Sequence, residues 1–365
     1  MNKRIILSNL NMPLLIVMSL LLIVGLANLY SATVPRDGSA QIFLTQIYWF
    51  LIGTLLLFSM LFIDYRSLDR FAYIIYFFAL VLLILVAVKG KTAMGGRRWL
   101  YLGSLSIQPS EFMKIALILA LSKYLSSSEQ DKPKGFSQLW IAFLMFLVPA
   151  VLVLKQPDLG TAIIICAISF SLIIISNVKW HVLLSVSLTG IVLFIFSFRF
   201  LLKNYQKKRI ESFINPEADL LGSGYHANQS MIAVGSGRGT GKGFMGSTQS
   251  QFSFLPEQHT DFIFSVFAEE WGFAGVFLTF GLFFFLMALI LDVSKNAKDK
   301  FGVFVSIGVF FLVFWHFIIN IGMIAGLLPV VGVTLPFFSA GGSSLISQFI
   351  GMGLVFNISM RRFSF

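Results

Sequence analysis

Three ionisable side chains with the potential for acid–base chemistry, Glu257, His259 and Asp261, stand close together in the sequence. They end a long polar, glycine-rich segment, and an apolar run that continues to about Leu291 follows directly. Carboxylates at a membrane boundary are costly to desolvate, so they are either well partnered or functional. Of the three, Asp261 is the strongest candidate for a functional role, although this stretch taken alone favours a structural one. The alternative is structural, because Thr260 or Asp261 would also suit the N-cap of the following helix.

A second group of candidate residues is basic. Arg97 and Arg98 follow paired glycines in the short segment Lys89–Trp99. Guanidinium groups pair bidentately with phosphate oxygens, so this segment is predicted to be a flexible loop that contacts an anionic ligand. Arginines that pair with lipid headgroups at the membrane interface are an equally good interpretation.

Three more charged residues lie on predicted spans or in the turns between them. Glu111 and Lys114 are three residues apart, so they share a helix face and can pair. Lys114 faces an otherwise apolar segment, and an intramembrane lysine is a functional candidate whose alternative is a structural ion pair with Glu111. Asp158 follows Pro157 in a turn, where a simple helix cap is the favoured interpretation.

The composition identifies the molecule that must position these residues as an all-α integral membrane protein. Of its 365 residues, 57% are hydrophobic and 12% charged, whereas soluble domains carry about 25% charged residues. Apolar runs of ~20 residues suit a bilayer core. Cys166 is the only cysteine, and the four histidines lack metal-ligand spacing, so no metal site is predicted. The predicted spans are residues 12–31, 43–63, 71–88, 111–125, 139–154, 161–176, 181–198, 262–291, 303–325 and 344–360.

The distribution of basic residues sets the orientation of this single transmembrane domain, residues 1–365. With the N-terminus inside, the inner segments hold thirteen Lys and Arg residues and the short outer loops six, as the positive-inside rule requires. Both termini are then cytoplasmic. The long loop of about residues 199–261, between spans seven and eight, lies outside together with Asp261.

Three outer segments carry further expectations. Residues 203–214 are predicted to form an amphipathic helix at the membrane surface. Residues 234–243 are rich in glycine but match no nucleotide-binding motif in any register, so they are predicted to be a mobile loop whose Arg238 and Lys242 touch an anion. Residues 326–344 carry no charge and are predicted to form a buried re-entrant loop that lines a cavity.

Several motifs together resemble the SEDS family (shape, elongation, division and sporulation), and the resemblance covers essentially all the predicted spans. The motifs are Gly95–Leu100 (GGRRWL), Gln108–Glu111 (QPSE), Gln156–Thr161 (QPDLGT), Leu255–Phe262 (LPEQHTDF), and the spaced pattern of Asn320, Gly326, Pro329, Gly332 and Phe337–Ser344. Gly222–Ser230 and Thr248–Ser250 resemble members that act in elongation rather than division. The sequence departs from the family pattern at Gln258, where many members have arginine.

The resemblance implies a peptidoglycan glycosyltransferase of the bacterial plasma membrane. Such an enzyme polymerises lipid II, which is both donor and acceptor, at the outer face during cell elongation. It implies a class B penicillin-binding protein (a transpeptidase) and the elongation machinery as partners within the membrane lipids; no nucleic-acid partner is predicted. The catalytic position falls on Asp261, and the substrate-binding positions fall on Arg97, Glu111, Lys114, Asp158, Glu257 and His259.

This chemistry suits the residues. Glycosyl transfer needs a base for the acceptor hydroxyl and positive charge for the departing pyrophosphate, roles predicted for Asp261 and for Arg97 with Lys114. The sequence requires no cofactor, although a divalent cation, Mg²⁺ or Mn²⁺, is compatible with it. The alternatives are a lipid II flippase and a non-catalytic scaffold of the cell-wall machinery. A flippase needs polar groups that reach both leaflets, whereas the candidates here crowd the outer side.

Overall fold

A bundle of ten apolar helices forms the body of the protein in the computed structural model, which describes residues 9–34, 40–93, 96–102, 105–127, 133–196, 204–214, 222–251, 254 and 257–362. Each predicted span overlaps one of them, so the predicted all-helical membrane architecture is confirmed. The ten helices are α2 (Met12–Thr33), α3 (Ala40–Phe62), α4 (Tyr65–Lys89), α5 (Pro109–Ser126), α6 (Phe136–Lys155), α7 (Leu159–Ile175), α8 (Trp180–Phe196), α12 (Ile263–Lys295), α13 (Lys300–Ile324) and α14 (Gly342–Arg361).

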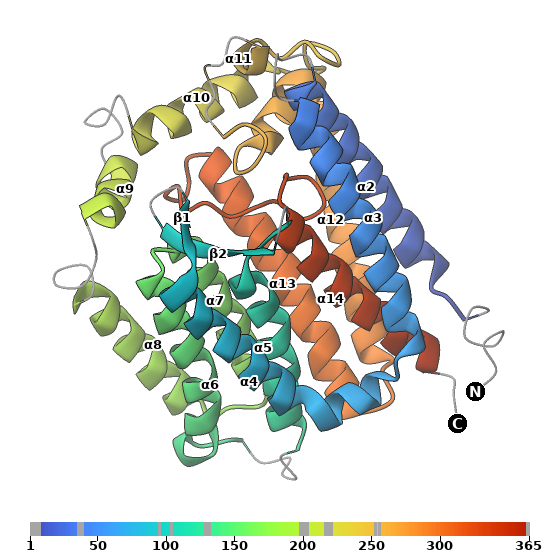
Figure 1. The fold of residues 1–365 in the computed structure, drawn as a ribbon, viewed down its shortest axis with the longest axis vertical. Helices are drawn as coiled ribbons and strands as arrows, with labels where there is room; N and C mark the ends of the chain where they lie inside the picture. The colour runs from blue at the N-terminus through green and yellow to red at the C-terminus, as the bar shows by residue number, and fades with distance from the viewer. Residues whose placement is uncertain are drawn as a thin grey trace.

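Length and hydropathy distinguish these helices. Seven of them, α2, α3, α4, α6, α12, α13 and α14, are long and apolar enough to cross a membrane, and α7 is a shorter apolar helix. Three further helices, α9 (Asn204–Ile214), α10 (Ser223–Ser236) and α11 (Thr248–Gln251), belong to the long outer loop. Helices α10 and α11 lie over the end of the bundle opposite the chain termini (Figure 1). The helix predicted for residues 203–214 is therefore confirmed as α9.

The arginine-bearing segment is a small sheet, which corrects the prediction of a flexible loop. Strands β1 (Lys91–Ala93), β2 (Gly96–Leu102) and β3 (Leu105–Ile107) pair antiparallel in that order. Strand β2 contains Trp99, Leu100 and Tyr101, and aromatic side chains favour extended backbone. Glycine is needed at Gly96 for a different reason, because a Cβ there would lie 3.0 Å from the carbonyl oxygen of Gln156. The sheet is thus fixed against the start of the α7 segment.

Helix α12 is a hairpin of two helices and not one continuous span. Its 33 residues would extend about 50 Å if straight, but Gly272 interrupts them with φ 61° and ψ −163°. The rings of Phe264 and Phe280 lie 5.7 Å apart, whereas sixteen residues of straight helix would separate them by about 24 Å. Residues 263–271 therefore fold back against residues 273–295, and only the second arm has the length of a membrane span.

The glycine-rich segment 237–243 closes the turn of this hairpin, which corrects the prediction of a mobile loop. The backbone N–H groups of Lys242 and Gly243 donate to the carbonyls of Glu269 (3.0 Å) and Glu270 (2.9 Å). A Cβ on Gly241 would lie 2.1 Å from the Glu270 carbonyl oxygen, so only glycine permits this approach. The anion that Lys242 touches is the buried Glu269 carboxylate, at 2.5 Å.

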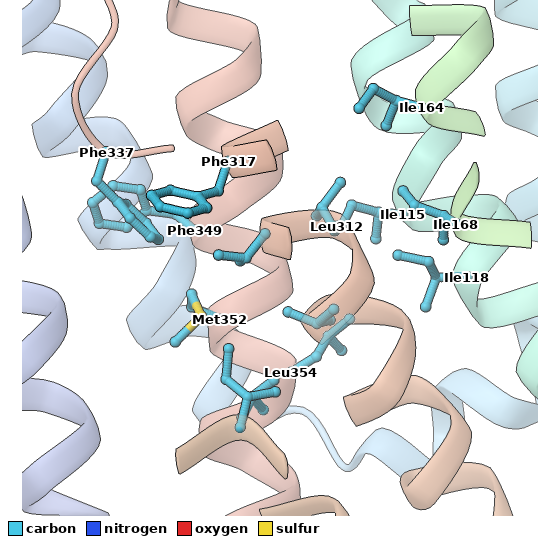
Figure 2. Close-up of a cluster of buried hydrophobic side chains, with 14 of the residues drawn as sticks. Ile115, Ile118, Ile164, Ile168, Leu312, Phe317, Phe337, Phe349, Met352 and Leu354 are labelled. Atoms are coloured by element: carbon cyan, nitrogen blue, oxygen red, sulfur yellow. The ribbon is translucent and has the colours of Figure 1, made fainter. Parts of the chain in front are cut away.

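A tightly packed apolar cluster lies where α5, α7, α13 and α14 meet (Figure 2). Ile118 and Leu312 are 0% and 1% exposed. A Cβ on Gly308 would lie 2.4 Å from Cγ2 of Ile118, so α13 and α5 approach closely at this glycine. Such close packing makes these helices a rigid support for the polar groups at their outer ends.

Candidate active site

Asp261 lies in a turn that precedes α12 and does not cap the helix. The N-cap residue is Phe262, and no side chain caps this helix end. The Thr260 hydroxyl donates instead to Glu257, at 3.0 Å from its Oε2. The structural alternative considered for Thr260 and Asp261 is therefore wrong. Asp261 is half-buried, and no hydrogen-bond or ion-pair partner of its carboxylate is found among the described residues.

The residues of α13 and of the loop after it hold Asp261 in place. The Asn320 side chain donates from Nδ2 to the carbonyl oxygens of Asp261 (2.9 Å) and Val333 (2.7 Å). Gly332, with φ 74°, lies under the carboxylate, and a Cβ there would be 3.3 Å from Asp261 Oδ2. Asn320 is four residues before the end of α13, which places Asp261 about 6 Å, one helical turn, below that end. It thus lies inside the bundle rather than at its rim.

The prediction of a buried loop over residues 326–344 holds for its later part, because residues 335–340 are buried, whereas Leu327 near its start is 73% exposed. Ser339 Oγ donates to the Thr260 carbonyl at 2.6 Å, and the Ala340 N–H donates to the His259 carbonyl at 2.9 Å. Phe338 is 1% exposed and packs against Phe264 and other phenylalanines of the hairpin. The irregular backbone thereby reaches into the bundle and fixes the turn that carries Asp261 and its two ionisable neighbours.

The surroundings of Asp261 raise its pKa to about 6. Burial of the carboxyl group is the largest cause, and the nearby negative charge of Glu257 is the second. The positive charges of Arg209 on α9 and of Arg98 on β2 oppose this shift. A carboxylate with a pKa near neutrality suits a general base. Arg209, Asp158 and Arg98, from three segments distant in the sequence, thus act together with the neighbouring Glu257 on the same carboxyl group.

Asp158 caps α7 and also binds groups from two other elements. Its carboxylate accepts from the backbone N–H of Thr161 (3.2 Å) and from the Gln108 side chain (2.9 Å). Arg98 Nη1 lies 3.9 Å from Asp158, and the Arg98 side chain also donates to the carbonyls of Gln156 and Pro157. The predicted cap is confirmed, and the aspartate has the further role of anchoring Arg98.

The two neighbouring arginines differ in position. Arg97, the predicted ligand-binding residue, is exposed on β2, whereas Arg98 is half-buried against the Asp158 turn. Adjacent residues of a strand point to opposite faces. Of this pair, Arg98 is the one whose charge acts on Asp261. The sequence offered no means of choosing between them, because the strand and its register were not foreseen.

Glu111 and Lys114 form a buried ion pair of 2.7 Å, and their side chains are 8% and 1% exposed. Lys114 Nζ also lies 2.9 Å from His316 Nε2. His316 Nδ1 must carry the proton, because it lies 2.7 Å from the Leu312 carbonyl oxygen, and Nε2 therefore accepts from Lys114. The contacts of this cluster are with α13 and α14 and not with Asp261. They agree with the structural alternative for Lys114.

Sequence reasoning gave no role to His316, Arg209 or Asn320. His316 lies 202 positions from Lys114, and Arg209 stands among several cations on α9. Asn320 was part of a recognised motif, which was the only available signal. Among the described residues, no three His, Cys, Asp or Glu side chains are grouped so that they could hold a metal ion.

Comparisons with known proteins were made for the sequence and for the fold. A family model described as "Cell cycle protein", which covers FtsW, RodA and SpoVE, matches residues 7–363. The chain is 36% identical over 355 residues to "Peptidoglycan glycosyltransferase MrdB" of Escherichia coli K12, covering 97% of this chain and 94% of that protein. It is 37% identical over 361 residues to "Stage V sporulation protein E" of Bacillus subtilis, covering 95% and 96%.

Two solved structures share the whole fold. A chain from "Structural coordination of polymerization and crosslinking by a peptidoglycan synthase complex" superposes with a TM-score of 0.84 at 30% identity, covering 98% of this chain and 99% of that one. The rod shape determining protein RodA of Thermus thermophilus superposes with a TM-score of 0.73 at 29% identity, covering 98% of each chain.

Proposed function

The chain belongs to the SEDS family, the group of FtsW, RodA and SpoVE, and from this membership we propose that it builds peptidoglycan glycan strands in the bacterial plasma membrane. It is a glycosyltransferase that polymerises lipid II at the outer face during cell elongation. Relatives named peptidoglycan glycosyltransferase MrdB and RodA, which match over nearly the whole chain, support the reaction, and the likeness to the rod shape determining protein RodA supports the role in cell shape.

One observation supports the mechanism: Asp261 is a half-buried carboxylate that does not cap a helix and has a pKa of about 6. In the proposed step, the acceptor sugar hydroxyl attacks the anomeric carbon of the donor and passes its proton to Asp261. A new glycosidic bond forms as the bond from that carbon to the phosphate oxygen breaks. The bonding electrons leave with the lipid pyrophosphate, so no oxidant, reductant or further reactant is needed.

Positive charge is needed where the pyrophosphate departs. Arg98 and Arg209 are suited to this role, because their charges already act on the Asp261 carboxyl group. Arg97, exposed on the same strand as Arg98, remains a candidate for contacts with a larger part of the substrate. Lys114 is less suited, since its charge is neutralised by Glu111 inside the bundle. Asp158, Glu257 and His259 would shape the site around the base.

A crosslinking enzyme, a class B penicillin-binding protein, is the proposed partner. The similarity to a chain from a peptidoglycan synthase complex that joins polymerisation and crosslinking supports this partnership. The partner would crosslink strands as they leave the polymerase, within the elongation machinery.

The test supplies lipid II to the full-length protein, purified with its partner, and measures glycan polymer on a gel. Asp261→Asn should abolish polymer while the complex still forms, because the amide cannot accept the proton. Asp292→Asn is the matched control, since Asp292 is exposed at the inner end of α12. Near-normal polymer from Asp261→Asn would refute the base. Transfer of intact lipid II across a proteoliposome membrane without polymer would instead indicate a flippase.

A further inference from the structure

A large cavity opens at the end of the bundle opposite Asp261, where no described step of the proposed reaction takes place. It has a volume of about 710 Å³, within the range of roughly 300–1,000 Å³ that is usual for ligand sites. The first turn of α4, the last turns of α5 and the connection from α12 to α13 surround it. Its charged lining residues are Arg66, Asp69, Lys123, Lys298, Asp299 and Lys300. We call it the inner cavity.

One of the two carboxylates in the inner cavity is already engaged by the protein. Asp299 caps α13 by accepting from the Gly302 N–H at 2.7 Å, and it accepts from the Tyr65 hydroxyl at 2.5 Å. Arg66 Nε lies 3.6 Å from the same carboxylate. These contacts fix Asp299 and Arg66 in the wall. Asp299 therefore organises the cavity wall, and because four cations face the two carboxylates Asp69 and Asp299, the lining keeps a net positive charge.

Two lysines of the inner cavity, Lys123 and Lys300, form no ion pair with a carboxylate among the described residues. Lys123 Nζ donates to the carbonyls of Asp69 (2.7 Å) and Arg70 (3.3 Å) and lies 4.9 Å from the centre of the Tyr73 ring. These neutral partners hold the ammonium group in position but do not cancel its charge. Lys300 is exposed at the start of α13.

A neighbouring lysine shows that positive charge is concentrated here. Lys134, in the connection before α6, is buried and donates to the Leu125 carbonyl at 3.0 Å. Its pKa is lowered, first by burial and then by the positive charge of Lys300. Like charges that repel one another in a folded protein are relieved when an anion binds between or beside them. The local field therefore favours an anionic ligand.

We propose that the inner cavity binds a phosphate-bearing anion, supplied either by the headgroup of an anionic phospholipid of the inner leaflet or by a soluble phosphate compound. Basic pockets between membrane helices on the cytoplasmic side are suited to such headgroups. Arg66 supplies a planar donor fork and the lysines supply mobile point charges, a combination that matches phosphate oxygens. Cations from three distant chain segments line this one cavity. The excess of basic residues on the inner side of membrane proteins would not by itself bring them together at one place.

The experiment uses the full-length protein in detergent, with thermal unfolding and native mass spectrometry as readouts. Three probes are titrated separately: phosphatidylglycerol, the neutral phosphatidylcholine, and inorganic pyrophosphate. We expect phosphatidylglycerol or pyrophosphate to stabilise the protein and phosphatidylcholine to have no such effect. Stabilisation by phosphatidylglycerol alone assigns the lipid headgroup, and equal stabilisation by pyrophosphate assigns a soluble ligand.

Variants place the binding in the cavity. Lys298→Gln with Lys300→Gln should weaken binding about fivefold for each cation removed, and Lys300→Arg should retain binding. Lys295→Gln is the matched control, because Lys295 is exposed at the same end of the bundle but does not line the cavity. Unfolding without added probe checks that each variant is folded. Equal loss in the control and the double variant, or no stabilisation of the wild type by either anion, would overturn the proposal.

Discussion

Replacing Lys114 by methionine separates a structural ion pair from a catalytic cation. The Lys114 and Glu111 side chains are 1% and 8% exposed and 2.7 Å apart. Methionine has nearly the same length but no charge, so Glu111 would stay buried with only the Ser347 hydroxyl, at 3.3 Å. Breaking a buried pair by removing one partner costs about 3–5 kcal/mol. His316 Nε2 would also lose its donor.

The assay compares thermal unfolding with polymerisation for the same preparations. We expect Lys114→Met to lower the melting temperature by several degrees, because a loss of about 1 kcal/mol already lowers it by roughly 2–4 °C in a protein of moderate size. Lys295→Met, at an exposed site, is the control and should change it little. The double variant Glu111→Gln with Lys114→Met removes both charges and should recover most of the lost stability.

The pattern of outcomes decides between the two roles. If the pair is structural, activity and stability fall together in the single variant and return together in the double variant. Unchanged unfolding of Lys114→Met with turnover abolished would refute this reasoning and return the lysine to the pyrophosphate-binding role predicted from the sequence. Stability that recovers without activity would point to the same catalytic role.

Three further predictions concern the base, the hairpin and the sheet. Turnover should fall as the pH is lowered through about 6, where Asp261 takes up a proton. The raised pKa of Asp261 in the folded protein also means that its ionised form lowers the stability of the fold above that pH. Asp261→Asn should therefore melt at a higher temperature than the wild type at pH 8, by a margin that shrinks below pH 6. A flat activity profile would contradict the assignment. Gly272→Ala should sharply reduce the yield of folded protein, since a side chain is strained at φ 61° and would collide with backbone, whereas Gly281→Ala in the same helix meets open space and should fold normally. Arg98→Ala should reduce polymerisation more than Arg97→Ala does, and the reverse order, measured at equal protein levels, would favour the residue chosen from the sequence.

The spans were predictable because the signal for them is local. Asp64, Asp158 and Asp299 accept N-cap hydrogen bonds at helix starts, and apolar runs of sufficient length follow. The hairpin was not predictable, because a glycine in an apolar run also suits close helix packing. The backbone angles of Gly272 and the Phe264–Phe280 contact reveal the reversal only in the fold.

The site was predictable for residues that stand close together in the sequence and not for those that meet only in the fold. Asp261 was identified from its neighbours within one turn. Nothing in the sequence indicates that Asn320 would hold its carbonyl, or that His316 would accept from Lys114. The choice of Arg98 over Arg97 depends on which face of a strand each side chain takes, and a shift of one residue would exchange them.

The short arm of the α12 hairpin, residues 263–271, connects the outer loop directly to the turn that carries the proposed base, Asp261. Residues 263–271 form a stiff rod about 13 Å long, with Asp261 just before one end and the backbone grip of segment 237–243 at the other. Because a helix of this length is stiff, we expect a movement of segment 237–243 to be passed along residues 263–271 to the turn that carries Asp261. One residue inserted into this rod would turn Asp261 by about 100° relative to the grip. The length of this arm therefore sets the orientation of Asp261, the proposed base for the acceptor sugar, relative to segment 237–243 of the outer loop.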